Sequence, residues 1–408
     1  MRVLYFHQHF STPSGATGIR SYEMAQRLLK RGHQVTMVCG SYNGGVTGIT
    51  EPFVKGKRRA NVNGIDVIEF DLAYSNNTNF LKRSLLFVSF ALKSIGLLFS
   101  EKYDIVFSTT TPLTAGIPGI VAHYIKRKPF VFEVRDLWPE LPKAMGVIKN
   151  PLILGAMSLL ETLSYKAATC CIGLSPGIVK GIKEKKGQDS RVVMIPNGCD
   201  FAIFSADDIT PWRPDTISEQ DFLAIFTGTH GIANGLDAVL NTAAVLKQRG
   251  RTDIKLALFG QGKLKAELEA RAKEEELDNI IFHQPVNKTK LAGLMASANI
   301  GMQTLANVPA FYYGTSPNKF FDYISAGLPV INNYPGWLAE NIERHDCGYA
   351  VEPDNPTAFA DALIKAADNP KELALKGDKA KQLAQEVFNR HDLANLWVDT
   401  LEQVNEGK

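Results

Sequence analysis

The sequence lacks the signatures of a secreted, disulfide-bonded protein. Only five of its 408 residues are cysteine, and these show neither a paired spacing nor a C-x-x-C motif. The first ten residues, MRVLYFHQHF, contain neither the apolar core nor the cleavage site of a signal peptide. These absences predict a soluble cytoplasmic protein with reduced thiols.

The dinucleotide fingerprint G-x-G-x-x-G is also absent. The loop after the first predicted strand carries Gly15 and Gly18 instead, and no acid follows the second strand at the spacing that a nicotinamide ribose needs. This disfavours a dehydrogenase, and we expect no bound cofactor. The two glycines keep the loop open for close approach to a phosphate or sugar, although an ordinary tight turn uses the same residues.

The periodicity of the chain predicts an α/β fold with two domains. With 45% hydrophobic and 21% charged residues, 408 residues suit two domains of about 200 residues each. Short apolar runs alternate with helical patterns, which is typical of doubly wound, Rossmann-like parallel sheets. We predict a first domain at 1–200, a second at 201–388 and a terminal helix, 389–408, that returns to the first. The predicted strands are 2–6, 34–39, 66–70, 104–109, 130–134, 170–175 and 192–196, followed by 222–228, 254–260, 279–284, 299–305 and 328–333.

Charge is distributed unevenly between the halves. Residues 1–200 hold 25 Lys/Arg against 14 Asp/Glu, whereas residues 201–408 hold 20 against 28. The basic clusters of the first half suit an anionic membrane or a phosphorylated acceptor, although solvated surface lysines would look the same. These clusters are Lys55/Lys57/Arg58/Arg59, Lys82/Arg83, Lys126/Arg127/Lys128 and Lys183/Lys185/Lys186.

The segment 80–100 is strongly apolar but is interrupted by Lys93 and preceded by Lys82 and Arg83. It is therefore unsuited to crossing a bilayer, and it predicts either a core helix or a helix lying in the membrane interface. We favour membrane contact because the segment lies in the basic half. Nothing predicts nucleic-acid binding, and the oligomeric state stays open.

The segment 312–330, YYGTSPNKFFDYISAGLPV, gives the clearest site prediction. Ser316 is a candidate N-cap, followed by Pro317 and Asn318, so that backbone N–H groups face the carboxyl edge of the sheet and suit a diphosphate. Lys319 adds a cation, and Asp322 can accept hydrogen bonds from ribose hydroxyls. The alternative is a generic β-α-β crossover.

Two glycine-rich turns of the second half end at the same predicted edge. They are TGTHGIANG, with Thr229, His230 and Asn234, and FGQGKLK, with Gly260, Gly262 and Lys265. We expect Lys265 to reach the diphosphate and His230 to donate to it, while the turn at Pro285 meets the base. His230 could equally be an ordinary turn residue.

In the first half, FVFEVRDLWPE places Arg135 and Asp136 at the end of a strand, with Glu140 just beyond. Asp136 could accept the proton of an acceptor hydroxyl, Arg135 could orient it or bind phosphate, and Glu140 is a second candidate base. A structural ion pair between Arg135 and Asp136 would produce the same pattern.

The order of these motifs resembles a known family. The glycine loop with RSYEMAQRLLKRGHQV, then IPNGCD, FTGTHG, FGQG and SPNKFFDYISAGLPV, are similar over nearly the whole chain to retaining GT-B glycosyltransferases of family 4. VRDLWPE together with SPNK resembles the WbuB-type subgroup, thought to transfer N-acetyl-L-fucosamine or a related aminosugar during surface polysaccharide synthesis. In departures from the pattern, Gly314 and Asp322 replace paired glutamates, Thr229 and Asn234 replace an arginine and a lysine, and Arg135 replaces a histidine.

The resemblance implies two Rossmann-like domains facing across a cleft. A UDP-sugar would lie mainly on the second and a lipid-linked or saccharide acceptor on the first, as in O-antigen or lipopolysaccharide synthesis. No D-x-D motif occurs, so no metal is expected. Two alternatives stay open, namely a UDP-sugar 2-epimerase of the same fold and a non-catalytic sugar-nucleotide-binding protein.

Overall fold

The computed structural model describes residues 1–408 except 16–17, 75–77, 206–207 and 408. The chain forms two compact units. Unit 1 comprises Met1–Pro196, Gly314–Ser316 and His391–Lys408, and unit 2 comprises Asn197–Tyr313 and Pro317–Arg390. The chain first leaves unit 1 at Pro196/Asn197, where the sequence suggested residue 200, and it finally returns at Arg390/His391, inside the terminal helix.

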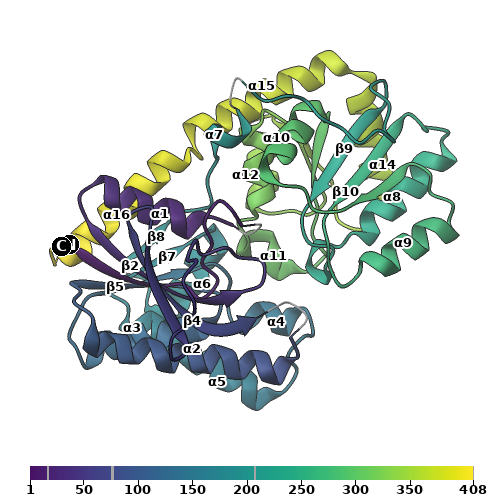
Figure 1. The fold of residues 1–408 in the computed structure, drawn as a ribbon. Helices are drawn as coiled ribbons and strands as arrows, with labels where there is room; N and C mark the ends of the chain where they lie inside the picture. Colours follow the sequence, from purple (N-terminus) through teal and green to yellow (C-terminus); the bar gives the residue numbers. More distant parts are fainter. Residues whose placement is uncertain (16–17, 75–77, 206–207, 408) are drawn as a thin grey trace. The chain divides into compact units, whose positions relative to one another are not determined.

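Unit 1 is built on an eight-stranded sheet with the order β3-β4-β2-β1-β5-β6-β7-β8 (Figure 1). β3 and β4 pair antiparallel, and all other neighbours are parallel. The strands are β1 (Arg2–Phe6), β2 (Gln34–Tyr42), β3 (Lys57–Val62), β4 (Ile65–Tyr74), β5 (Ile105–Thr109), β6 (Phe130–Val134), β7 (Cys170–Gly173) and β8 (Val192–Met194).

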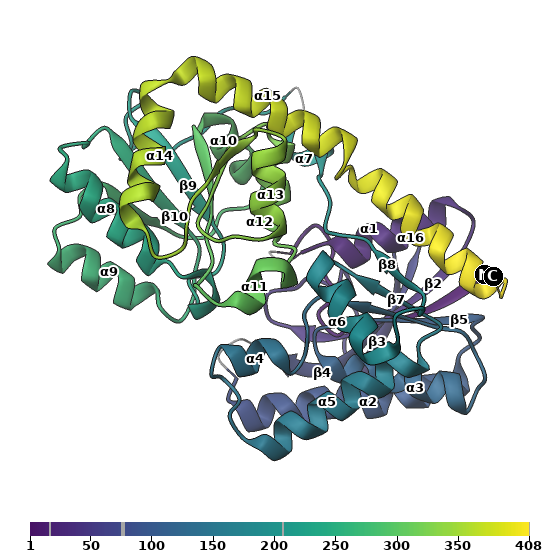
Figure 2. The same ribbon diagram turned by 180° about the vertical axis from the view of Figure 1, so that it is seen from behind.

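Helices cover both faces of this sheet. One apolar cluster joins the sheet to α1 and α16, and another joins its opposite face to α2, α3, α5 and α6 (Figure 2). Asn79, Asn150 and Ser175 cap α2, α5 and α6 with their side chains, which is why these helices begin where they do. The helices are α1 (Arg20–Lys30), α2 (Phe80–Ser100), α3 (Gly116–Tyr124), α4 (Glu140–Ala144), α5 (Pro151–Ala167), α6 (Pro176–Lys186) and α16 (Arg390–Asn405).

Unit 2 has a parallel six-stranded sheet with the order β11-β10-β9-β12-β13-β14. Its strands are β9 (Phe222–Thr227), β10 (Ile254–Phe259), β11 (Ile280–His283), β12 (Ile300–Gln303), β13 (Val330–Asn332) and β14 (Gly348–Ala350). Its helices are α7 (Phe201–Phe204), α8 (Asp237–Gln248), α9 (Lys265–Glu274), α10 (Lys288–Ser297), α11 (Pro309–Gly314), α12 (Asn318–Ser325), α13 (Trp337–Arg344), α14 (Pro356–Asp368) and α15 (Pro370–Glu386).

Two strands were absent from the sequence prediction. β3, KRRANV, is too polar to look like a strand, yet it pairs with β4 through a two-residue turn at Asn63 and Gly64, both with positive φ. Arg58 binds Glu69 and Arg59 binds Asp66 across the pair. The sequence left open whether these two arginines meet an anionic partner or solvent, and in the structure both pair with carboxylates of unit 1. β14, GYA, is too short to carry a recognisable pattern.

The last helix, α16, completes the core of unit 1 beside α1 (Figure 1). Trp397 is fully buried, with its ring centroid 5.9 Å from that of Tyr5 and 4.8 Å from that of Phe107. Truncation here would leave a large cavity against the sheet.

Trp397→Ala is therefore expected to lower the free energy of unfolding of unit 1 by about 3–5 kcal/mol. Trp397→Phe is the matched control, because it keeps an aromatic ring and removes an indole N–H that has no partner within the described part of the chain. Chemical denaturation measures both. Equal stability of the two variants would contradict a packing role for the indole.

Candidate functional site

In unit 2, α12 is fixed against the sheet by Tyr323. The backbone N–H of Thr227 donates to the Tyr323 hydroxyl at 3.0 Å. The ring lies over Gly301, where a Cβ atom would come within 2.5 Å of it, so this position requires glycine. Tyr323 thus positions the first turn of α12, one helical turn earlier, at the carboxyl end of β9.

Lys319 extends from that first turn to the loop after β9. Its Nζ donates to Oδ1 of Asn234 at 2.7 Å and lies 4.2 Å from the centroid of the Phe226 ring. Asn234 in turn donates from Nδ2 to the carbonyl of Thr229 at 2.7 Å. Burial lowers the pKa of Lys319 to about 7. Because no carboxylate pairs with it in the described structure, this amine can meet an anionic ligand.

The two glycine-rich turns pack directly on each other. A Cβ atom at Gly260 would lie 1.8 Å from the carbonyl oxygen of Gly228, and one at Gly262 would lie 2.3 Å from that of His230. The N–H of His230 also donates to the carbonyl of Gln261 at 2.9 Å. Gly260 and Gly262 are therefore required for the contact between the turns, whether or not they also face a ligand.

Lys265 does not present its amine to a ligand. Its Nζ donates to the backbone carbonyls of Gly260, at 3.0 Å, and His283, at 2.8 Å, and the residue is buried. The predicted contact with a diphosphate is corrected to a structural role, because the amine already joins the ends of β10 and β11.

His230 is completely buried, and both of its ring nitrogens lack partners among the described residues. Burial, together with Lys265 and Lys319, lowers the pKa of His230 to about 4, so the ring is neutral and can donate only one hydrogen. Pro285 follows β11 and is exposed. Neither position decides between a ligand contact and an ordinary turn residue, so the roles of His230 and Pro285 stay predictions.

The start of α12 differs from the prediction. The helix begins at Asn318 with Pro317 as its N-cap, so Ser316 lies one position too early to cap it. The extended ψ of Pro317, 127°, prevents the helix from beginning before Asn318. Asn318 is exposed in the first turn. Burial raises the pKa of Asp322 to about 7, against the opposing effects of Arg390 and Lys288.

In unit 1, Arg135 is held at the end of β6 by three side chains. Its Nε donates to Oγ1 of Thr109 at 2.8 Å and to Oε1 of Glu133 at 3.2 Å, and its Nη2 donates to Oγ of Ser21 at 3.0 Å. The side chain is 21% exposed. The ion pair of Arg135 is therefore with Glu133.

Asp136 is partly buried, whereas Glu140 is exposed at the start of α4. Burial raises the pKa of Asp136, opposed by Arg135 and by a hydrogen bond from Thr111. A raised pKa suits a proton acceptor, so the environment favours Asp136 over Glu140 as the base.

The sequence prediction missed other polar residues at this end of the sheet. Arg20 and Glu133 form a buried ion pair of 3.0 Å, and an acid within the apolar run FVFEV was the available signal. His7 and His9 follow β1, and burial with Arg135 nearby lowers the pKa of His9 to about 4.

In the predicted glycine loop, Gly15 packs against Val46, where a Cβ atom would lie 2.9 Å from the Val46 nitrogen. Gly18 is exposed, and residues 16–17 between the two glycines lie outside the described structure.

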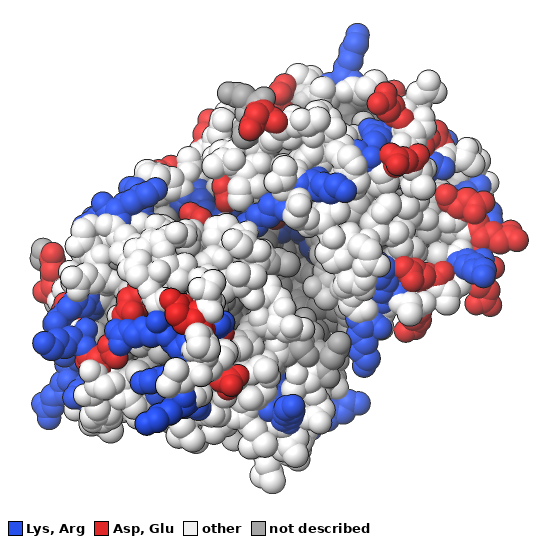
Figure 3. Space-filling model, in the orientation of Figure 1, with Lys and Arg blue, Asp and Glu red and all other residues white. Residues whose placement is uncertain are grey.

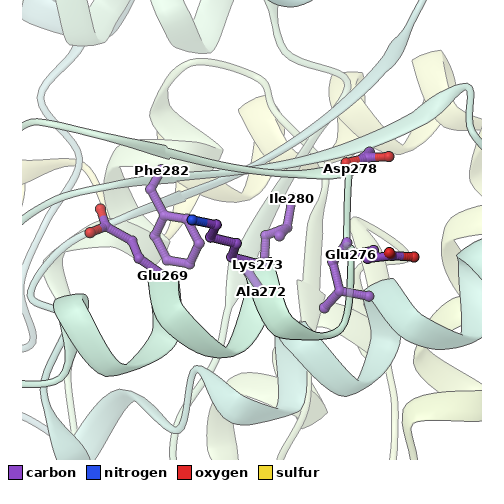
Figure 4. Close-up of a pocket in the computed structure, with 8 residues that line it drawn as sticks. Glu269, Ala272, Lys273, Glu276, Asp278, Ile280 and Phe282 are labelled. Carbon is purple, nitrogen blue, oxygen red and sulfur yellow. The ribbon is translucent and has the colours of Figure 1, made fainter.

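A surface hollow in unit 2 borders the two glycine-rich turns, since its lining residue Glu269 lies 3.9 Å from the amine of Lys265 (Figure 4). It follows α9 and the edge strand β11, and none of the predicted site residues lines it. The lining residues are Glu269, Ala272, Lys273, Glu276, Leu277, Asp278, Ile280 and Phe282.

Family models match both halves of the chain. Residues 15–198 match the model described as glycosyl transferase 4-like domain, and residues 208–384 match that of glycosyl transferases group 1. These matches favour a transferase over the epimerase and the non-catalytic binder.

Similar proteins agree with this assignment. The O-antigen chain mannosyltransferase C of Escherichia coli is 20% identical over 265 residues, covering 64% of this chain and 68% of that protein. Sucrose-phosphate synthase of Thermosynechococcus elongatus has a TM-score of 0.78 at 16% identity over the full length of both chains. Anabaena Alr3699/HepE, in complex with UDP and glucose, has a TM-score of 0.69 at 16% identity, covering 99% of this chain and 100% of that one. The structural likeness confirms the predicted GT-B fold class of two Rossmann-like domains.

Proposed function

We propose that this glycosyltransferase, with its glycosyl transferase 4-like and group 1 domains, moves a sugar from a UDP-sugar to a lipid-linked or saccharide acceptor, without a metal and with retention at the anomeric carbon. The observation that carries the proposal is Lys319, which stands in the first turn of α12 beside the loop after β9. A helix amino terminus with a cation next to it can stabilise a departing diphosphate without a metal ion.

The position of Lys319 also accounts for a departure from the family pattern. Thr229 and Asn234 stand where the resemblance to family 4 implies an arginine and a lysine, and Lys319 binds Asn234 directly. The positive charge is thus supplied to the same loop from α12. Asp322 lies on the next turn of α12 and supports a ribose contact, and the complex of Alr3699/HepE with UDP supports uridine as the base.

The nucleotide is tested by thermal unfolding with UDP, GDP, ADP, CMP and NAD, each with and without EDTA. We expect UDP to raise the melting temperature equally under both conditions. A shift that needs a metal, or one seen only with NAD, would overturn the proposal. Retention is tested separately by the anomeric configuration of the product.

The acceptor is assigned to unit 1, where Arg135 and Asp136 lie at the carboxyl edge of the sheet. The name of the Escherichia coli relative supports a polysaccharide or its lipid-linked precursor as the acceptor. That relative is a mannosyltransferase, whereas the motifs VRDLWPE and SPNK favour an aminosugar of the WbuB type. Screening both sugar classes as donors decides between them.

We further propose that the enzyme acts at the cytoplasmic face of a membrane. Apolar side chains that unit 1 exposes on two helices, α2 and α5, support contact with that membrane. On α2, Leu81, Leu85, Val88 and Leu92 form a stripe that is 45–71% exposed. On α5, Leu152, Leu159 and Leu163 are 40–82% exposed. Both helices pack on α3, and the surface over them is mostly uncharged, with basic and some acidic side chains around it (Figure 3). We call this the α2/α5 surface.

The charge of the α2/α5 surface matches an anionic bilayer. Helices α2, α3 and α5 contain one acid, Glu161, which is buried and bound to Lys185, whereas Lys82, Arg83, Lys93 and Lys166 are basic. Among the described residues, Leu81–Ser100 is long and apolar enough to span a membrane by length and composition. However, Phe90, Leu97 and Leu98 are buried in the core of unit 1, which favours a helix lying in the interface.

Replacing Leu85 and Leu92 with Gln, or Leu152 and Leu159 with Gln, is expected to weaken binding to phosphatidylglycerol-containing vesicles by about 30-fold, since each exposed leucine would bury apolar area in the interface. Cosedimentation measures the binding, which should also fall with added salt. Leu375→Gln is the control, because Leu375 is 61% exposed on α15 of unit 2. Equal binding by all three proteins would contradict the proposal.

A further inference from the structure

Glu133 occupies the centre of a buried polar network in unit 1. Its side chain is completely buried near the end of β6, and each carboxylate oxygen has separate partners. Oε2 accepts from Nε and Nη2 of Arg20, at 3.1 and 3.0 Å. Oε1 accepts from Oγ1 of Thr109, at 2.8 Å, and from Nε of Arg135, at 3.2 Å. Burial opposes ionisation, but Arg20 and Arg135 outweigh it and lower the pKa of Glu133, so the group is a carboxylate.

The two sides of this carboxylate have different consequences. Through Oε2 it holds Arg20, whose guanidinium also donates to the carbonyls of Ile195, at 2.9 Å, and Pro196, at 2.6 Å. That side fixes the last residues of unit 1 before the chain leaves it. The Oε1 side instead fixes the guanidinium of Arg135, together with Thr109 and Ser21.

The contacts of Arg135 leave one nitrogen for a ligand. Nε and Nη2 are bound by Thr109, Glu133 and Ser21, whereas Nη1 has no partner among the residues that the structure describes. A guanidinium held along one edge presents its remaining N–H groups in a fixed direction, which lowers the entropic cost of binding an anionic oxygen.

We propose that Glu133 is a positioning residue: it holds Arg135 so that Nη1 can bind an anionic oxygen of the acceptor, such as a phosphate. The inference rests on the proposed function, since it assumes that unit 1 binds the acceptor. Glu133 itself is too deeply buried to meet substrate, and it acts through Arg135.

Thr109→Val separates the two sides, because it removes the hydrogen bond from Thr109 to Oε1 and one acceptor for Arg135, while leaving the pair between Glu133 and Arg20 intact. We expect kcat/KM for the acceptor to fall about 10-fold for Thr109→Val and about 10–100-fold for Glu133→Gln, with the dissociation constant of UDP unchanged. The fall should appear well below the melting temperature of each variant. Glu133→Asp is expected to recover part of the loss.

The matched control is Glu161→Gln, which neutralises another buried carboxylate of unit 1, bound to Lys185 and Tyr165. It should lower stability but leave kcat/KM unchanged. A wild-type value of kcat/KM in both Thr109→Val and Glu133→Gln would overturn the positioning role. An equal loss of kcat/KM in Glu161→Gln would also overturn it. A crystal structure of Glu133→Gln is a readout that needs no transfer: Arg135 should leave Thr109 and Ser21, and an unmoved guanidinium would overturn the inference. Absence of transfer by the wild type would count instead against the proposed function.

Discussion

Lys319→Met is expected to weaken UDP binding by about 30-fold, or about 2 kcal/mol, which is the size of a charge-assisted hydrogen bond. The chain should stay folded, because methionine keeps the apolar contact with Phe226 and loses only the bond to Asn234. Isothermal titration calorimetry measures the dissociation constant. The matched control is Lys263→Met, which removes an exposed cation from the neighbouring turn. Equal affinity in both variants would exclude α12 as the diphosphate site.

The same lysine gives UDP binding a pH dependence. Its pKa of about 7 means that the amine loses its charge as the pH rises through neutrality, so affinity for an anion should fall between about pH 6 and about pH 8. Lys319→Arg keeps the charge over this range. The ratio of wild-type to Lys319→Arg affinities cancels the titrations of UDP and of Asp322, whose own pKa is about 7. A ratio that stays constant with pH would contradict a titrating Lys319.

Asp136→Asn is expected to lower kcat by about 10²–10⁴-fold while leaving the dissociation constant of UDP unchanged. The carboxylate would accept the proton of the acceptor hydroxyl, whereas the residues proposed to bind UDP belong to unit 2. Because burial raises the pKa of Asp136, the wild-type rate should fall as the pH is lowered through that pKa, where the group becomes protonated. The pH–rate profile measures this limb, which the variant should lack.

Glu140→Gln serves as the comparison, because Glu140 is exposed in the first turn of α4 and should affect kcat little. A large loss in Glu140→Gln with none in Asp136→Asn would exchange their roles. Similar losses in both would indicate that the two carboxylates share the proton.

The apolar strands could be predicted from the sequence because burial on both faces leaves continuous hydrophobic runs. RVLYF and FVFEV became β1 and β6 with the predicted bounds. The strand β3 was missed because its own residues, KRRANV, carry no apolar pattern, although Asn63-Gly64 between it and β4 is a two-residue hairpin signal. A basic cluster and a salt-bridged edge strand have the same composition.

The start of α12 was predictable to within one residue, because one segment carries the information. The order Pro317, Asn318, Lys319 reveals a helix start and a cation without any tertiary knowledge. The contacts of the Lys265 amine are with the carbonyls of Gly260 and His283, which lie at the ends of different strands. No local sequence pattern predicts such contacts. Glu133 is visible in the sequence as an acid within an apolar strand, but its partners Arg20 and Thr109 are distant in sequence and could not be predicted.

The return of α16 to unit 1 has a consequence for biosynthesis. The face of the sheet that carries Tyr5 and Phe107 stays uncovered by Trp397 until residues 391–408 have left the ribosome. Unit 2 lies between residues 1–196 and 391–408 in the chain and is fully translated before the latter. It can therefore fold first, although its translation begins second. An isolated fragment ending at Pro196 would retain that uncovered face permanently, and recombinant expression of unit 1 alone should require the terminal helix to be supplied.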